Sequence, residues 1–156
     1  MDRAPVDEPV DIPRGLGDTV AILDGKAQGK SVAITLSVPP DIPPINGVGV
    51  EINQIWMNLI DNAIDAAPAR GHVDVTAAQE GTNVLVRVID DGAGIPADIV
   101  EKIFDPFFTT KPVGEGTGLG LDIVRRIVQW HNGEIEVDSR PGRTEFRVKM
   151  PVSGRE

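Results

Sequence analysis

The sequence contains no cysteine, so disulfide bonds, thiolate metal sites and cysteine nucleophiles are excluded. Aromatic residues make up only 4% of the chain, and aliphatic side chains must therefore fill the core. No apolar run approaches the roughly 20 residues that a membrane-spanning helix needs. Residues 1–20 are acidic and broken by prolines, unlike a signal peptide. These absences predict a soluble domain, and we expect it to be cytoplasmic.

Positive charge is also scarce, because 15 lysines and arginines stand against 24 acidic residues, a net charge of -9. Such a domain is poorly suited to bind DNA, RNA or an anionic membrane, and we expect none of these partners. The net negative charge of the domain also repels the phosphates of a nucleotide. Any nucleotide site must therefore supply backbone N–H donors, a cation or both.

The length of 156 residues and the apolar fraction of 40% are typical of one globular domain. Residues 1–14 carry three prolines among acidic residues, and we expect an extended lead-in or linker there. Residues 15–152 would form the domain and residues 153–156 a tail.

Hydrophobic periodicity predicts interspersed helices and strands. The clearest helix covers residues 48–67, where apolar residues recur on one broad face. Residues 83–90 are mostly apolar on both faces, which is typical of a central strand. The other predicted helices are residues 16–28, 96–103 and 119–131, and the other predicted strands are residues 32–37, 72–78, 134–138 and 143–150. This order favours an α+β two-layer sandwich over a doubly wound parallel sheet.

Two asparagines, Asn58 and Asn62, lie one turn apart in the middle of the clearest helix. Asparagine is a weak helix former because its amide competes for backbone hydrogen bonds, so the pair calls for an explanation. One explanation is that the amide oxygens face a divalent cation and phosphates, since Mg²⁺ prefers oxygen ligands. The other is an ordinary solvated helix face.

A second motif, Asp90 to Gly94, comes at the end of the predicted central strand. A carboxylate at a strand end can accept a hydrogen bond from an exocyclic amine, such as the N6 amine of adenine. Gly92 and Gly94 lack a Cβ atom, so a flat base could approach the backbone closely. A tight Asp-Gly turn is the alternative.

Glycines recur from Gly114 to Gly120, just before the last predicted helix. Glycine amides at a helix N-terminus form an anion site, because unpaired N–H groups and the helix dipole point at the ligand. A merely flexible loop is the alternative. The run follows a loop rather than a strand, unlike the dinucleotide-binding pattern, and it lacks the Gly-Lys-Ser/Thr ending of a P-loop.

Three of the four phenylalanines lie within residues 104–108, and Lys111 follows them. This segment is either a plug in the core or the hinge of a mobile lid. In the second case Lys111 would be available to a phosphate.

In order and spacing, these motifs resemble the N, G1, F and G2 boxes of the sensor histidine kinases, over about residues 16–151. The matching segments are Asn58-Leu59-Ile60-Asp61-Asn62-Ala63, Asp90-Asp91-Gly92-Ala93-Gly94-Ile95-Pro96, Phe104-Asp105-Pro106-Phe107-Phe108 and Gly116-Thr117-Gly118-Leu119-Gly120-Leu121. The segment Gly142-Arg143-Thr144-Glu145-Phe146 resembles the final glycine-threonine box.

The resemblance implies a Bergerat ATP-binding fold, a mixed and mostly antiparallel sheet covered on one face by helices, that binds ATP and Mg²⁺. It implies that Asp90 holds the adenine amine with Thr144 near the base, and that Asn62 ligates magnesium beside Asn58. Catalysis would depend on Asn58, Asn62 and Lys111. The other implied nucleotide contacts are Gly92, Gly94, Ile95, Gly116, Thr117, Gly118, Leu119 and Gly120.

The chain departs from the family pattern in two respects. Many members have a basic residue where this chain has Asp65. Neither His72 nor His131 lies in the helical setting of a phosphoacceptor, and both are predicted to be surface or capping residues. The implied acceptor is therefore a histidine on separate dimerisation helices, which would pass the phosphoryl group to a response regulator receiver domain. We expect the isolated domain to be monomeric, with Phe107 and Phe108 as candidates for docking those helices.

Three alternatives remain open. Gyrase-like, chaperone and mismatch-repair ATPases share the fold, but they use a glutamate one turn before the magnesium asparagine as general base. This chain has Asn58 there, and Glu51 lies two turns further away, so we expect slow hydrolysis or none. An anti-sigma-type serine kinase is the second alternative, although the phenylalanine-rich segment favours a histidine kinase. A module that binds nucleotide or a partner without catalysis is the third, and the intact motifs argue against it.

Overall fold

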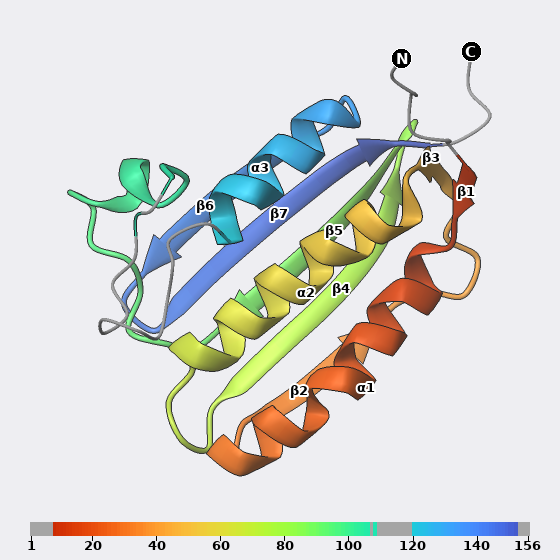
Figure 1. Cartoon of the computed structure of the whole chain (residues 1–156). Helices are drawn as coiled ribbons and strands as arrows, with labels where there is room; N and C mark the ends of the chain where they lie inside the picture. Colours follow the sequence, from red (N-terminus) through yellow and green to blue (C-terminus); the bar gives the residue numbers. More distant parts are fainter. Residues whose placement is uncertain (1–7, 107, 109–119, 153–156) are drawn as a thin grey trace.

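The computed structural model describes residues 8–106, 108 and 120–152, which form a five-stranded sheet covered on one face by helices (Figure 1). The helices are α1 (Ile12–Lys30), α2 (Gly49–Ala66), the 3₁₀ turn Val100–Lys102 and α3 (Gly120–Trp130). The strands are β1 (Glu8–Val10), β2 (Ala33–Ser37), β3 (Ile45–Gly47), β4 (His72–Glu80), β5 (Asn83–Asp90), β6 (Glu134–Arg140) and β7 (Arg143–Pro151).

The large sheet has the strand order β2-β4-β5-β7-β6, with β5 in the centre as the apolar pattern predicted. Strand β2 runs parallel to β4, and the other neighbouring pairs are antiparallel. Strands β1 and β3 form a separate antiparallel pair at one end of the molecule. The predicted α+β sandwich, with a mostly antiparallel sheet covered on one face, is confirmed.

Helix α2 lies between α1 and α3 across the sheet (Figure 1). Its apolar residues recur at spacings of three and four, so that one face is buried against the sheet. The buried side chains of α2 are Ile52, Ile55, Trp56, Leu59, Ile60, Ala63 and Ile64. Alternate residues of the central strands meet them, namely Val73, Val75, Val84, Val86, Val88, Phe146 and Val148. Burial of these mostly aliphatic side chains is the main force that holds the two layers together.

The first helix begins earlier than the sequence predicted. Asp11 caps its N-terminus by accepting a hydrogen bond from the Arg14 N–H at 3.1 Å, and Pro13 lies in the first turn, where a missing N–H costs no helical bond. Val10 and Ile12 are buried, and β1 pairs with β3. Residues 8–14 are therefore part of the folded domain, and their prediction as an extended lead-in was wrong.

The segment 96–103 is also different from its prediction as a short helix. The backbone N–H groups of Ile99 and Lys102 donate to carbonyl groups three residues back, and only Val100–Lys102 forms a 3₁₀ turn. The tighter bonding leaves no regular α-helix there. The other helices and strands lie within a few residues of their predicted bounds, except that the expected start of the last helix at Leu119 is outside the described residues.

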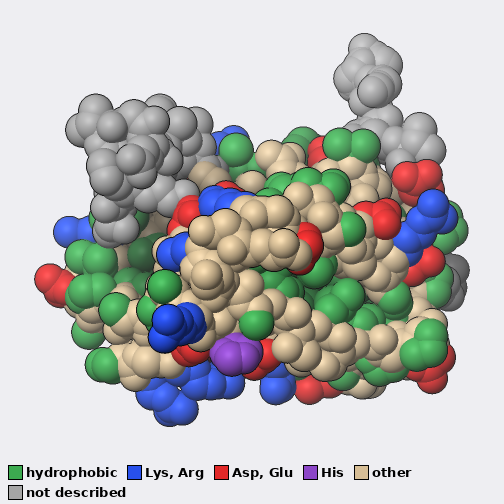
Figure 2. All heavy atoms as spheres, turned by 90° about the horizontal axis from the view of Figure 1, so that it is seen from below, with side chains coloured by type: hydrophobic (Ala, Val, Ile, Leu, Met, Phe, Trp, Pro, Cys, Tyr) green, Lys and Arg blue, Asp and Glu red, His purple; other side chains and the backbone are tan. Residues whose placement is uncertain are grey.

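The two edges of the large sheet differ in charge. Edge strand β6 carries Glu134, Glu136, Asp138 and Arg140, whereas β2 has no charged residue and leaves Leu36 37% exposed. Figure 2 looks from below at the side where α1 and β2 lie, and shows hydrophobic and charged side chains intermixed over it. Charged residues protect a sheet edge from pairing with other chains, so β6 is the better protected edge. None of the described helices is long and apolar enough to cross a membrane.

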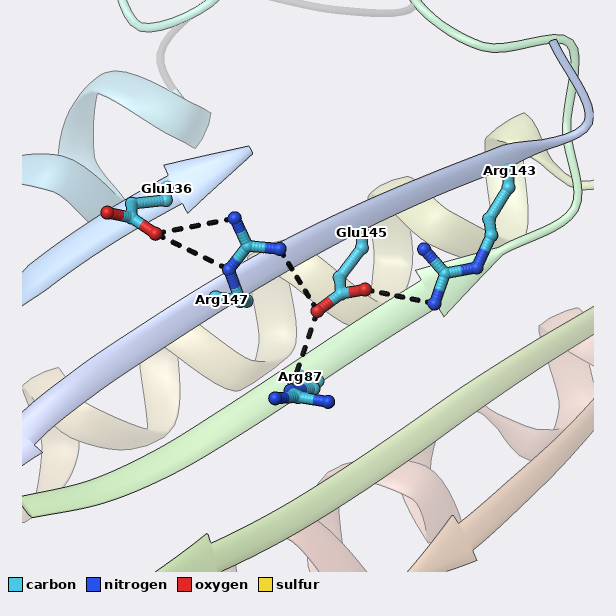
Figure 3. A network of polar contacts seen from close by, with 5 residues as sticks. All are labelled: Arg87, Glu136, Arg143, Glu145 and Arg147. Atoms are coloured by element: carbon cyan, nitrogen blue, oxygen red, sulfur yellow. Dashed lines mark hydrogen bonds and ion pairs between the residues drawn. The ribbon is translucent and has the colours of Figure 1, made fainter. Parts of the chain in front are cut away.

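The helix-free face of the sheet carries a network of ion pairs centred on Glu145 (Figure 3). The Glu145 carboxylate lies 2.9 Å from Arg143, 3.2 Å from Arg147 and 3.5 Å from Arg87, and Arg147 also contacts Glu136 at 3.3 Å. Burial by itself would raise the pKa of Glu145, but hydrogen bonds from Arg143 and Arg147 outweigh it and hold that pKa below its ordinary value. The network therefore ties β5 to β7 through the buried Glu145 carboxylate, and β7 to β6 through the contact of Arg147 with Glu136.

Candidate functional site

Three polar residues form a row across one end of the sheet, on the face that the helices cover. Asp90 is the last residue of β5, its cross-strand partner on β7 is Thr144, and the partner of Thr144 on β6 is Ser139. Asp90 and Thr144 are each only 4% exposed. The sheet therefore brings a carboxylate and two hydroxyl groups side by side.

The Asp90 carboxylate has spare capacity to accept hydrogen bonds. Its Oδ1 atom accepts one from the Gly92 N–H at 2.9 Å, and no residue in the described part of the chain donates to Oδ2. Burial raises the pKa of Asp90 above its ordinary value; the Gly92 N–H lowers it and the neighbouring Asp91 charge raises it, each to a smaller extent. A buried acceptor of this kind suits a ligand that donates an N–H group, such as an exocyclic amine.

Glycine is required at positions 92 and 94, because neighbouring backbone atoms leave no room for a Cβ atom. A Cβ atom at Gly92 would lie 2.4 Å from the Ala66 carbonyl oxygen, and one at Gly94 would lie 2.5 Å from the Arg140 carbonyl oxygen. Gly94 also has a positive φ of 91°, which favours glycine. The sequence suggested that these glycines let a base approach, whereas their missing side chains face the end of α2 and the end of β6. The loop after Asp90 is therefore wedged between these two elements.

The two asparagines of α2 occupy different environments. The Asn58 Nδ2 group donates to the carbonyl oxygen of Gly120 at 3.2 Å, which joins α2 to the first residue of α3. Asn62 is half-buried, and within the described ranges its amide has no hydrogen-bond partner. The amide oxygen of Asn62 is therefore available to a ligand or a metal ion.

Asp65, which departs from the family pattern, belongs to a contact between helices. Its carboxylate lies 2.7 Å from the Lys26 ammonium group of α1, and Asp61 lies 2.6 Å from the same group. Asp65 therefore pairs with α1, on the opposite side of α2 from α3.

Several residues that the sequence singled out lie outside the described residues: Phe107, Lys111, Gly116, Thr117, Gly118 and Leu119. Phe104 is described and is buried, with its ring in edge-to-face contact with Phe146 at 6.3 Å between centroids. The Arg125 guanidinium of α3 lies 5.4 Å from the centre of the same ring. Phe108 is partly buried against the core. Phe104 thus packs as a core plug that holds the start of this segment against the sheet and α3.

Both ring nitrogens of His131 are used in structural hydrogen bonds. Its Nε2 atom accepts from the Val48 N–H at 3.2 Å, so Nδ1 carries the proton and donates to the Ile127 carbonyl oxygen at 2.8 Å. The ring therefore joins the C-terminus of α3 to the N-terminus of α2, and the predicted capping role of His131 is confirmed. His72 is exposed at the start of β4, as predicted.

Sequence reasoning missed Ser139 and the role of Asp91. Ser139 continues an alternation with Ile135 and Val137 on the helix-covered face of β6, so a polar residue at an apolar position was the signal. Asp91 accepts hydrogen bonds from the backbone of His72. No local pattern could reveal that contact, because its partner lies 19 residues away.

The family of histidine kinase-, DNA gyrase B- and HSP90-like ATPases matches residues 47–154. The chain belongs to this family. The sensory histidine kinase/phosphatase NtrB of Rhodobacter capsulatus is 37% identical over 167 residues, which cover 99% of this chain and 46% of NtrB. The chain spans less than half the length of the curated relatives that it matches.

Solved structures of histidine kinases share the fold. The catalytic domain of ThkA matches with a TM-score of 0.85 and 28% identity, over 94% of this chain and 98% of that domain. ThkA in complex with the response regulator TrrA matches with a TM-score of 0.79 and 26% identity, over 95% of this chain and 42% of ThkA. Full-length ShkA in complex with AMPPNP matches with a TM-score of 0.84 and 30% identity, over 97% of this chain and 32% of ShkA. Membership of this ATPase family implies that the domain binds ATP.

Proposed function

We propose that this chain is the ATP-binding catalytic domain of a sensor histidine kinase, and that it transfers the γ-phosphoryl group of Mg-ATP to a histidine on a separate dimerisation domain. The buried Asp90 carboxylate carries the proposal, because nothing among the described residues donates to its Oδ2 atom and its cross-strand partner is Thr144. Adenine presents an amine donor next to a ring-nitrogen acceptor. A carboxylate and a hydroxyl side by side can pair with both groups.

The residues of α2 suit a magnesium ion. The half-buried Asn62 amide lacks a partner among the described residues, and Asn58 is held nearby through Gly120. Mg²⁺ readily combines one or two protein oxygens with waters and substrate phosphates. We infer that Asn62 ligates the ion with Asn58 beside it, and that the ion neutralises charge on the phosphates during transfer.

The reaction breaks the bond between the γ-phosphorus and the oxygen that bridges it to the β-phosphate, and it forms a phosphorus–nitrogen bond to the acceptor imidazole. ADP leaves, and the imidazole releases a proton. This chain has to position the nucleotide and neutralise charge, and it needs no nucleophile of its own. The glycines before α3 and Lys111 are proposed to contact the phosphates.

The structure of α2 argues against a water-activating ATPase. Asn58 stands where such enzymes carry the general base, and a neutral amide is too weak a base to take a proton from water. Glu51 lies in the first turn of α2, roughly 16 Å along the helix axis from Asn62. We therefore expect ATP turnover without an acceptor histidine to be slow or absent.

Transfer to a response regulator, and a cytoplasmic location in which both proteins meet ATP, follow from the proposed kinase role. The ThkA complex with TrrA supports a regulator as the downstream partner, because ThkA shares the fold of this chain. The dimerisation helices of the parent kinase would carry the acceptor histidine. The domain by itself is expected to be monomeric.

Nucleotide binding is tested by calorimetric titration of the purified domain with ATP, with and without Mg²⁺. Asp90→Asn should abolish or greatly weaken binding, whereas Asp74→Asn, which alters an exposed carboxylate on neighbouring β4, should leave it unchanged. If neither calorimetry nor a fluorescent ATP analogue detects binding to the unmodified domain, the kinase proposal is wrong.

Catalysis is tested by adding the dimerisation domain of a related sensor kinase and following acid-labile phosphate on its histidine. Asn62→Ala should remove transfer and the magnesium dependence of ATP binding. Gln54→Ala, which truncates an exposed amide on α2, is the matched control. Phosphate on serine, or rapid ATP hydrolysis without an acceptor, would favour the rival kinase or ATPase assignments.

A further inference from the structure

The hydroxyl of Ser139 joins two parts of the site that are far apart in the sequence. The backbone N–H of Ile95 donates to Ser139 Oγ at 2.7 Å, and this oxygen also lies 2.7 Å from Thr144 Oγ1. Thr144 is in turn the cross-strand partner of Asp90. A chain of contacts therefore runs from the loop after β5, through Ser139, to the hydroxyl next to the Asp90 carboxylate.

The backbone conformation of the loop after β5 fixes the first of these contacts, the one between Ile95 and Ser139. At Gly94, φ is 91°, and the position of a Cβ atom there would be 2.5 Å from the Arg140 carbonyl oxygen. The loop therefore lies directly against the end of β6, one residue after Ser139. Since Ile95 follows Gly94, this contact holds the Ile95 N–H within reach of the Ser139 hydroxyl.

The donor and acceptor groups of Ser139 favour one direction for its second hydrogen bond, which either hydroxyl could donate. A serine hydroxyl has one proton and two acceptor lone pairs, and the Ile95 N–H occupies one lone pair. Accepting that bond strengthens the hydroxyl as a donor. In the direction that this favours, Ser139 donates its proton to Thr144 Oγ1, which leaves the Thr144 proton directed away from Ser139. Within the described residues, the Thr144 hydroxyl has no other partner.

We propose that Ser139 is a positioning residue that holds the Thr144 hydroxyl as a hydrogen-bond donor and so favours adenine over guanine. The inference rests on the proposed ATP-binding function. Adenine presents the N6 amine donor next to the N1 acceptor, whereas guanine presents the O6 acceptor next to an N1–H donor. The Asp90 carboxylate and a donating Thr144 hydroxyl match the N6 amine and the N1 acceptor of adenine. The same two groups face the O6 acceptor and the N1–H donor of guanine wrongly, so the site would select adenine by repelling guanine as well as by attracting adenine.

The test compares ATP, GTP and 1-deaza-ATP, in which C–H replaces N1, as ligands of the intact chain with Mg²⁺. Ser139→Ala should weaken ATP binding by about three- to tenfold, the range that one hydrogen bond contributes, and should narrow the preference for ATP over GTP. It should leave the weaker binding of 1-deaza-ATP unchanged, because that ligand cannot accept at N1. Ser139→Thr, which keeps the hydroxyl, should restore ATP binding, and Ser37→Ala on edge strand β2 is the matched control.

Equal weakening of ATP and 1-deaza-ATP in Ser139→Ala would show a merely structural role and overturn the inference. Unchanged ATP binding in that variant would also overturn it. Should Ser139→Ala fail to fold, Ser139→Cys nearly keeps the volume but donates weakly, and it should show the same loss of selectivity. The unmodified protein provides a further check, because equal affinity for ATP and 1-deaza-ATP would exclude a donor at N1. Absence of any ATP binding by the unmodified protein would instead refute the proposed function, and this inference with it.

Discussion

Both carboxylate oxygens of Asp91 accept a hydrogen bond from the backbone N–H of His72, at 3.0 and 3.1 Å. His72 is the first residue of β4, and Asp91 directly follows the last residue of β5. The contact therefore anchors the loop that begins at Asp90 to the neighbouring strand. Its position next to the proposed adenine-binding carboxylate links the stability of the sheet to the shape of the site.

Loss of this anchor should affect both folding and binding. We expect Asp91→Ala to lower the free energy of unfolding by about 1–2 kcal/mol, because it removes a charge-assisted hydrogen bond. The same variant should weaken ATP binding severalfold, while Asp91→Asn, which keeps one acceptor oxygen, should lose less of each. Denaturant unfolding and ATP titration measure the two effects. Asp98→Ala in the exposed loop is the control, and an effect of equal size there would refute the anchoring role.

The raised pKa of Asp90 predicts opposite effects on stability and binding. A carboxyl whose folded-state pKa is above its unfolded value stabilises the fold below the unfolded pKa, and that stability is lost as pH rises through the folded pKa. At neutral pH the buried charge is therefore a cost, and Asp90→Asn should unfold at the same or a higher temperature than the unmodified domain while losing ATP binding. A large fall in melting temperature would contradict this prediction.

ATP affinity should itself depend on the ionisation of Asp90. Because the carboxylate is the proposed acceptor for the adenine amine, affinity should fall as the pH is lowered through the raised pKa of Asp90. Calorimetric titrations from neutral to acidic pH measure this fall. Asp74→Asn should leave the pH profile unaltered, since its carboxylate is exposed and lies outside the site.

Glu145 predicts the opposite pH dependence of stability. Its pKa is lowered in the folded state, so its stabilising contribution is present above the unfolded pKa of about 4.3 and is lost as pH falls through the folded value. We expect Glu145→Gln to cost about 1–3 kcal/mol at neutral pH, because Arg87 and Arg143 then lose this carboxylate partner and Arg147 keeps only Glu136. The free energy of unfolding of this variant should also fall less as the pH is lowered. Glu136→Gln, an exposed partner in the same network, should cost much less, and equal costs would argue against the central role of Glu145.

Two glycines offer a matched pair of substitutions with opposite effects. Gly17 lies inside α1 with nothing within 4 Å of the place that a Cβ atom would take, so Gly17→Ala should stabilise the domain by about 0.5–1 kcal/mol. Gly94→Ala would meet the Arg140 carbonyl oxygen at a positive φ, and should destabilise the domain by about 1–3 kcal/mol. Gly94→Ala should also weaken ATP binding, because the loop must move away from β6. Urea unfolding with parallel ATP titration measures both, and a neutral Gly94→Ala would show that the loop relaxes freely.

Much of the fold could be predicted because its signals are local. The three- and four-residue spacing of apolar residues indicated α2 almost to its last residue, and alternation indicated β4, β5 and the hairpin of β6 and β7. Strands β1 and β3 were missed, since three residues are too few to show a period. The early start of α1 was missed because Pro13 was taken as a sign of extended chain rather than of a helix's first turn.

The candidate site, like the fold, could be predicted only in part. The residue types and spacings of Asn58, Asn62, Asp90 and Thr144 were sufficient to indicate nucleotide chemistry and the family. Two contacts could not be predicted from the sequence. One is the pairing of Asp65 with Lys26, which spans 39 positions of the chain, and the other is the bridge from Ile95 through Ser139 to Thr144, which spans 49. Sequence by itself therefore determined the elements and the kind of ligand, because periodicity and motif chemistry act over a few residues. Only the tertiary structure decided which polar groups share a hydrogen bond, because strand register and helix packing bring distant residues together.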